Sequence, residues 1–117
     1  PEDECTDASV RFLIAEKVRE KLTRELSQEL PYDLTVMIEQ YEETPTLIKA
    51  GALIIVGRDS QKAIVIGKKG EILKKIGRLA RIDLEAMLGR KLFLTLWVKV
   101  KPGWNDNKTE LDRLGFD

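Results

Sequence analysis

The sequence contains no histidine and only one cysteine, Cys5. Thiolate and imidazole groups are the usual ligands of structural zinc, so this scarcity excludes a nitrogen- or sulfur-ligated metal site, and one cysteine cannot build a disulfide framework. The lack of histidine also removes the commonest general base of enzymes. No acidic cluster has the spacing of a calcium loop. We therefore expect no catalytic residue, no metal and no cofactor in this chain.

Long apolar runs are missing as well. None approaches the roughly 20 residues that cross a membrane, and no cationic segment followed by an apolar one opens the chain. We therefore expect no transmembrane segment and a cytoplasmic location. The phosphate-binding pattern Gly-x-x-x-x-Gly-Lys-Ser/Thr is absent, which excludes GTP binding by that device. The chain begins at Pro1 rather than at methionine, which favours a fragment of a longer protein.

The chain has no net charge, but its charges are unevenly distributed. Residues 1–60 carry 7 basic and 13 acidic side chains, a net charge of −6, whereas residues 61–103 carry 11 basic and 3 acidic ones, a net charge of +8. Electrostatic attraction acts over about one Debye length, so local charge density matters more than the total. A neutral protein can therefore present a positive face to a polyanion, and we look for function in residues 61–103.

The composition, 43% apolar and 34% charged, is typical of one compact domain. We expect a single domain over residues 1–117, with an N-terminal linker at 1–8 and a helical extension at 104–117. Helical and alternating apolar spacings, together with glycine, proline and capping residues, predict its elements. In chain order they are a helix from Thr6 or Asp7 to about Leu30, strands at 34–41 and 48–57, helices at 61–66 and 70–88, a strand at 90–101 and a helix at 107–114.

This element order predicts an α+β fold with helices on one face of a mixed three-stranded sheet. The two helices between the second and third strands form a crossover, and right-handed crossovers join parallel strands. The second strand is apolar on both faces at residues 52–56, which predicts a central position. In the third strand one face is apolar and the other carries Trp97. We expect the helix at 70–88 to bury Ile72, Leu73, Ile76, Ala80, Leu84, Met87 and Leu88.

The motif of interest is Gly67-Lys68-Lys69-Gly70, at the junction of the two middle helices. Glycine lacks a Cβ, so such a turn can approach a sugar-phosphate backbone closely. The following helix begins there, and its free N–H groups and dipole favour an anion. The two lysines add mobile positive charge. We expect three apolar neighbours to line a narrow groove for unpaired bases, namely Ile64, Ile66 and Ile72.

The stretch Val65-Ile66-Gly67-Lys68-Lys69-Gly70, followed by Ile72, Ile76 and Gly77, resembles the signature of the KH domain. The element order resembles the prokaryotic, type II arrangement of that family. The segments 29–32 and 96–104, Glu-Leu-Pro-Tyr and Leu-Trp-Val-Lys-Val-Lys-Pro-Gly-Trp, resemble the C-terminal RNA-binding domain of the bacterial Era-type GTPases. The likeness covers nearly the whole chain.

This resemblance implies a type II KH fold that holds about four nucleotides of single-stranded RNA. It further implies a parent protein with a GTP-binding domain in the same polypeptide, which binds the 3′ end of small-subunit rRNA and assists assembly of the small ribosomal subunit. Peripheral membrane association of the parent rests on the resemblance alone. The expected RNA-binding residues are Ile64, Ile66, Gly67, Lys68, Lys69, Gly70, Ile72, Lys74, Lys75 and Arg78.

Several residues have a structural interpretation beside the functional one. The basic residues 74, 75, 78 and 81 also fit the solvated face of an amphipathic helix. Gly77 fits close helix packing better than ligand contact, and Trp97 fits a half-buried position under the last helix better than base stacking. The mixed charges of the first helix suit the alternative function, a protein-interaction domain that docks a GTPase domain or a ribosomal protein. Single-stranded DNA also remains a possible ligand.

Overall fold

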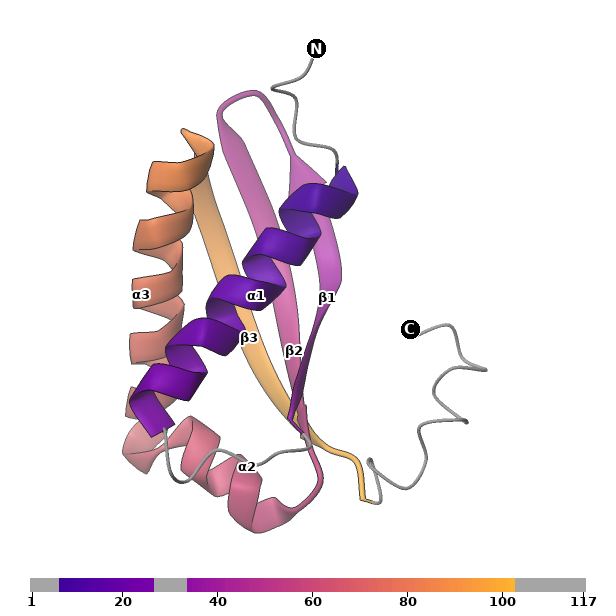
Figure 1. Ribbon diagram of the computed structural model, residues 1–117, viewed down its shortest axis with the longest axis vertical. Helices are drawn as coiled ribbons and strands as arrows, with labels where there is room; N and C mark the ends of the chain where they lie inside the picture. Colours follow the sequence, from indigo (N-terminus) through magenta and orange to yellow (C-terminus); the bar gives the residue numbers. More distant parts are fainter. Residues whose placement is uncertain (1–6, 27–33, 103–117) are drawn as a thin grey trace.

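The computed structural model describes residues 7–26 and 34–102. These residues form three α-helices, one 3-10 turn and three strands (Figure 1). The predicted helix at 107–114 and the predicted end of the first helix near Leu30 lie outside the described residues. In chain order the elements are α1 (Asp7–Leu26), β1 (Thr35–Glu43), β2 (Leu47–Val56), α2 (Asp59–Ile66), η1 (Lys68–Gly70), α3 (Glu71–Leu88) and β3 (Lys91–Val100).

The three strands form one mixed sheet in the order β1-β2-β3, as predicted. β1 pairs with β2 in antiparallel fashion through a short hairpin, and β2 pairs with β3 in parallel through the α2–α3 crossover. The central position of β2 follows from its composition, because Ala52, Ile54, Ile55 and Val56 are all buried. The parallel pairing sets α3 alongside β3, which positions the site described below.

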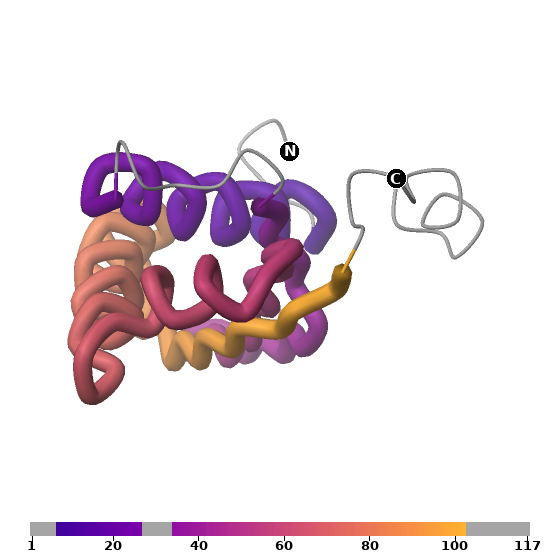
Figure 2. The backbone as a smooth tube through the Cα atoms, turned by 90° about the horizontal axis from the view of Figure 1, so that it is seen from below, coloured from indigo at the N-terminus to yellow at the C-terminus, as the bar shows by residue number. Residues whose placement is uncertain are grey.

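All three helices lie on one face of the sheet, and Figure 2 shows them above it with no described element beneath. The core between helices and sheet contains side chains from α1, β2 and α3 that are fully buried. The largest are Ile14, Leu22, Ile48, Ile54, Ile76 and Leu84. The predicted apolar face of β3, which includes Leu92, Leu94 and Leu96, packs on this core. Among the described residues, no element covers the opposite face of β3.

The first strand departs from the simple alternation that its sequence predicts. Val36 and Ile38 pack against the core, but so does Tyr41 three residues further on, because the register with β2 shifts between Ile38 and Gln40. Such a bulge adds one residue to one strand and exchanges its faces. The strand also extends to Glu43 instead of ending at 41. Gln40 and Glu42 consequently lie on the open face.

Two further predictions about the helices were wrong. The sequence predicts that Asp59 or Ser60 caps the short helix, but this helix begins at Asp59, with Arg58 at the N-cap and no side-chain cap bond. The Gln61 Oε1 atom instead accepts a hydrogen bond of 3.0 Å from the Gly57 N–H in the preceding turn. Met87, expected in the buried stripe of α3, is 54% exposed because its position turns it away from the sheet in the last turn.

An ion-pair network connects α1 with α3. The Lys21 Nζ atom lies 2.6 Å from Asp83 Oδ2 and 3.4 Å from Glu20 Oε2, and Lys17 Nζ reaches the same two carboxylates. The hydrogen bond from Lys21 lowers the pKa of Asp83, and the one from Lys17 lowers the pKa of Glu20. The hydrogen bond to Asp83 raises the pKa of Lys21. All three shifts show that the network favours the charged forms.

We expect acid to weaken this connection. A carboxylate whose pKa is lowered on folding stabilises the fold above its unfolded value, 3.8 for Asp83 and 4.5 for Glu20, and the benefit disappears as pH falls through the folded value. Because the pKa of Lys21 is raised on folding, its contribution to the stability of the fold is fully present below pH 10.5 and is not lost in acid. The urea midpoint of Asp83→Asn should therefore lie below that of the wild type at neutral pH, and the difference should shrink toward about pH 2. A difference that stays constant across this range would contradict the assignment.

Candidate nucleic-acid interface

The junction between α2 and α3 is a tight turn in which Gly67, Lys69 and Gly70 have positive φ. α2 ends where the Gly67 N–H donates to the Ala63 carbonyl at 2.9 Å, and Gly67 itself has φ 77° and ψ 175°. The Gly70 N–H then donates to the Gly67 carbonyl at 3.1 Å. Lys69 and Gly70 both adopt left-handed conformations, with φ 56° and 74°. The turn is therefore a defined structure and not a disordered linker.

Gly67 is required at its position for two independent reasons. Its combination of φ and ψ is essentially closed to residues with a Cβ. A Cβ placed there would also lie 2.6 Å from the Ile72 Cγ1 atom. Ile72 thus packs directly against the glycine and supports the turn from beneath. Gly70 differs, because a Cβ at that position would meet no atom within 4 Å.

The two lysines of the turn are exposed to solvent. Lys68 and Lys69 make no ion pair with any residue in the described ranges, which leaves both cations available to a ligand. The first turn of α3 begins beside them, where unpaired N–H groups favour an anion. The carboxylate of Glu71 lies in that turn and partly offsets the attraction of an anion. With Lys68 and Lys69 included, the net charge of the turn remains positive.

A groove of about 490 Å³ runs from this turn between α3 and β3. The α3 side provides the basic residues Lys74, Arg78 and Arg81, and β3 provides an apolar wall. Arg81 is partly neutralised, since its guanidinium lies 3.1 Å from the Glu85 carboxylate. Lys74 and Arg78 are exposed and have no acidic partner among the described residues. The complete lining is Gly70, Leu73, Lys74, Gly77, Arg78, Arg81, Leu94, Thr95 and Leu96.

The structure brings only some of the predicted site residues to this groove. Gly70, Lys74 and Arg78 line it, and Gly67, Lys68 and Lys69 form the turn at its end. Lys75 lies elsewhere, because its ammonium is 3.0 Å from the Glu25 carboxylate on α1.

The three predicted isoleucines do not line the groove either. Ile64 and Ile72 pack against the core, and Ile66 is half-buried at the end of α2. The groove takes its apolar lining instead from leucines of α3 and β3.

The residues that sequence reasoning left out follow a recognisable pattern. Positions 70, 73, 74, 77, 78 and 81 are spaced three or four apart, so they form one face of α3. Gly77 belongs to this face, and a Cβ there would lie 3.6 Å from Leu96, at ordinary contact distance. Had the spacing been continued from Gly70 along the helix, it would have identified Leu73, Gly77 and Arg81. The β3 residues could not be found this way, because only the folded crossover places them opposite α3.

The described residues include no group of three or more side chains suited to a metal ion. Among the helices that the structure describes, none is long and apolar enough to span a bilayer.

Comparison with known proteins gives consistent matches. Residues 29–105 match the family model of the KH domain. The chain is 53% identical over 116 residues to the protein named GTPase Era of Pseudomonas fluorescens strain Pf-5, and 51% identical to that of Marinobacter nauticus. Each match covers 99% of this chain but only 39% and 38% of the relative. The chain therefore spans about two fifths of the length of these curated relatives.

Solved structures show the same likeness. A crystal structure of Era in complex with MgGDPNP and nucleotides 1506–1542 of 16S ribosomal RNA matches with a TM-score of 0.83 and 41% identity, over 99% of this chain and 39% of the other. A variant of Aquifex aeolicus Era bound to GDP and AlF4− matches with the same TM-score and identity, over 40% of its length.

Proposed function

The chain belongs to the KH domain family, and we propose that it is a single-stranded RNA-binding module that uses the turn at 67–70 and the groove beside it. The observation that carries the proposal is the continuity of the two parts. An exposed, doubly cationic turn opens directly into a groove with basic residues on one side and an apolar wall on the other. A nucleotide strand needs both, because its phosphates require cations and its unstacked bases require apolar surface.

In this proposal each element has a defined task. Gly67 and Gly70 let the turn approach the sugar-phosphate backbone, and Lys68 and Lys69 bind its phosphates. Ile72 supports the turn by packing against Gly67, and Ile64 packs against the core. Further along the groove, Lys74 and Arg78 bind the strand on one side while bases pack on Leu94 and Leu96. Phosphate contacts then provide most of the affinity, and contacts to base edges provide selectivity.

The proposed partner follows from the relatives of the chain. A neighbour of 41% identity was crystallised with nucleotides 1506–1542 of 16S ribosomal RNA, and we infer that this chain binds the 3′ region of small-subunit rRNA. We further propose that it is the C-terminal module of a cytoplasmic GTPase that acts in assembly of the small ribosomal subunit. The chain itself then has no catalytic role, and GTP hydrolysis belongs to the part of the parent protein that precedes it.

The role of the groove can be tested by comparing Lys74 and Arg78, which line it, with the neighbouring Lys75, which does not. We expect Lys74→Ala and Arg78→Ala each to weaken binding of the 16S segment 1506–1542 by about tenfold, because each removes a charge-assisted contact. Lys75→Ala is the matched control, since its partner is Glu25 and not the ligand. Titrations at several salt concentrations should also show the slope of log affinity against log salt decrease by roughly 0.7 in the two groove variants. Equal effects at positions 74 and 75 would contradict this use of the groove.

The alternative role as a protein-docking domain loses its original support. It rested on the mixed charges of the first helix, and the structure pairs several of these within the chain. Arg11 bonds to Asp7, and Lys17 and Lys21 bond to Glu20 and Asp83. The exposed part of α1 therefore presents fewer free charges than the sequence indicates.

A further inference from the structure

The open face of the sheet carries aromatic and basic side chains. On β3 it presents Phe93, which is 61% exposed, and Trp97, which is 39% exposed. Lys49 and Lys99 project from the same face, since the strand register pairs Lys49 with Phe93 and Ile55 with Lys99. The helices lie on the other side of the sheet (Figure 2). Aromatic rings and lysines that share one exposed face can together contact the bases and phosphates of a nucleic acid.

The side chain of Trp97 extends over Gly51 on the neighbouring strand, where no side chain competes for the space. A Cβ at Gly51 would lie 2.5 Å from the Trp97 Cζ3 atom and 2.7 Å from its Cη2 atom, so the ring occupies the space above this glycine. The Gln40 side-chain oxygen lies over the same position. The six-membered ring of Trp97 thus lies close to Gly51 while the residue stays 39% exposed. A tryptophan fixed in this way is ready to stack with little loss of conformational entropy.

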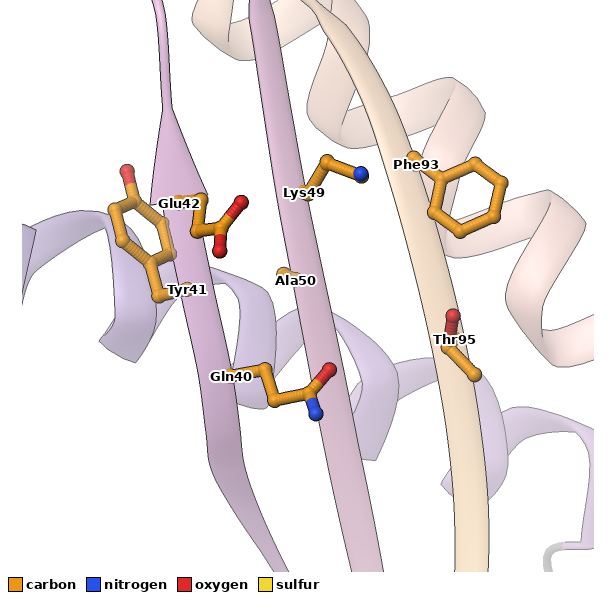
Figure 3. Close-up of a pocket in the computed structure, with 7 residues that line it drawn as sticks. All are labelled: Gln40, Tyr41, Glu42, Lys49, Ala50, Phe93 and Thr95. Atoms are coloured by element: carbon orange, nitrogen blue, oxygen red, sulfur yellow. The ribbon is translucent and has the colours of Figure 1, made fainter.

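Phe93 borders a hollow of about 340 Å³ on the same face (Figure 3). Lys49, Gln40 and Glu42 extend over the sheet there, whereas Tyr41 points to the helix side. An ammonium and an amide beside an aromatic ring suit a nucleotide, because they offer a phosphate partner and hydrogen bonds to base edges. Glu42 opposes a phosphate, but its carboxylate accepts hydrogen bonds from base amino groups.

The two sites are joined at Thr95. This residue lines both the groove between α3 and β3 and the hollow on the open face. β3 is an edge strand, paired with β2 alone in the described sheet, so no other strand separates the two surfaces. A chain that leaves the groove can therefore cross the edge of β3 and reach the aromatic face without a gap.

We propose that the aromatic face, defined by Phe93, Thr95 and Trp97 with Lys49 and Lys99, binds further unpaired nucleotides of the same RNA as they leave the groove. This inference rests on the proposed function. Phe93 and Trp97 are separated by four residues of strand, about 13 Å, which leaves room for stacked bases at both rings. RNA-binding sheets of other folds use exposed aromatic side chains in the same way. The basic character of the face favours RNA over an apolar protein segment as the occupant.

RNA length provides the test. We compare oligonucleotides of about five and about ten residues from the 3′ end of the 16S segment, because a KH groove accommodates about four nucleotides. Phe93→Ala should weaken binding of the longer RNA roughly tenfold and leave the shorter one unchanged, since each lost base stack has an effect of that size. Trp97→Leu should act in the same direction. Phe12→Ala is the matched control, because Phe12 is 63% exposed on α1, far from β3.

The outcomes separate this inference from the proposed function. If the unaltered chain fails to bind even the short RNA, the groove proposal fails. If the short RNA binds, but the long RNA gains no affinity or loses none in Phe93→Ala and Trp97→Leu, the aromatic face is not an RNA site.

Discussion

Replacing both turn lysines by aspartate, Lys68→Asp with Lys69→Asp, is expected to abolish binding of a short single-stranded RNA while leaving the fold intact. Both side chains are exposed and have no ion pair in the described residues, so their loss removes no packing. Each charge-assisted hydrogen bond contributes about 1.5–3 kcal/mol, so the loss of two weakens binding by more than about a hundredfold. The new carboxylates repel the phosphates and add to this effect. Fluorescence anisotropy at moderate salt measures the affinity, and circular dichroism checks the fold.

A control variant with the same change of net charge separates direct phosphate contacts at the turn from long-range attraction between the protein and the RNA. Arg11→Asp with Lys91→Asp reverses the same number of charges at the hairpin end of the molecule, where Arg11 lies over the Tyr41 ring and the Lys91 backbone N–H donates to the Thr46 carbonyl. Affinity for the short RNA should change little in this variant. If both double variants weaken binding equally, the turn has no special role and long-range attraction accounts for the affinity.

Most of the fold could be predicted because it depends on the spacing of apolar residues along the chain and on the rule that right-handed crossovers join parallel strands. The apolar spacing of α1, the two-sided burial of β2 and the crossover before β3 each rest on neighbouring residues. The bulge near Glu39 could not be foreseen, since a register shift depends on the partner strand. The exposure of Met87 is a similar case, because periodicity does not show where the core ends along a helix.

The candidate site was predicted only in its local part. The Gly-Lys-Lys-Gly turn is contiguous in the sequence, and the structure exposes its lysines. The groove wall is not contiguous, because Leu94 and Leu96 meet α3 only through the parallel pairing of β2 and β3. The predicted isoleucines lie outside this lining: Ile72 packs against Gly67, and Ile64 packs against the core. The ion pair of Lys75 could not be predicted for the same reason, as its partner Glu25 is 50 residues away in the sequence.

Comparison of the two turn glycines separates the folding role of this motif from its binding role. Gly70→Ala places a Cβ in open space at an ordinary left-handed conformation, so it should destabilise the fold by only about 1 kcal/mol. In the complex, however, the added methyl group stands between the turn and the nucleotide backbone. We expect this variant to lose RNA affinity while keeping its urea midpoint close to that of the wild type.

Gly67→Ala should behave in the opposite way and cost about 3 kcal/mol or more of the free energy of unfolding. Its backbone conformation is strained for alanine by about 1–3 kcal/mol, and the new Cβ overlaps Ile72 at a further cost of similar size. Ile72→Ala tests the second part, because it removes the Cγ1 and Cδ1 atoms that the new Cβ meets. The double variant should then lose less stability than the sum of the two single changes. Additive losses in urea unfolding would show that Ile72 does not support the turn, and equal stability of Gly67→Ala and Gly70→Ala would contradict the backbone geometry itself.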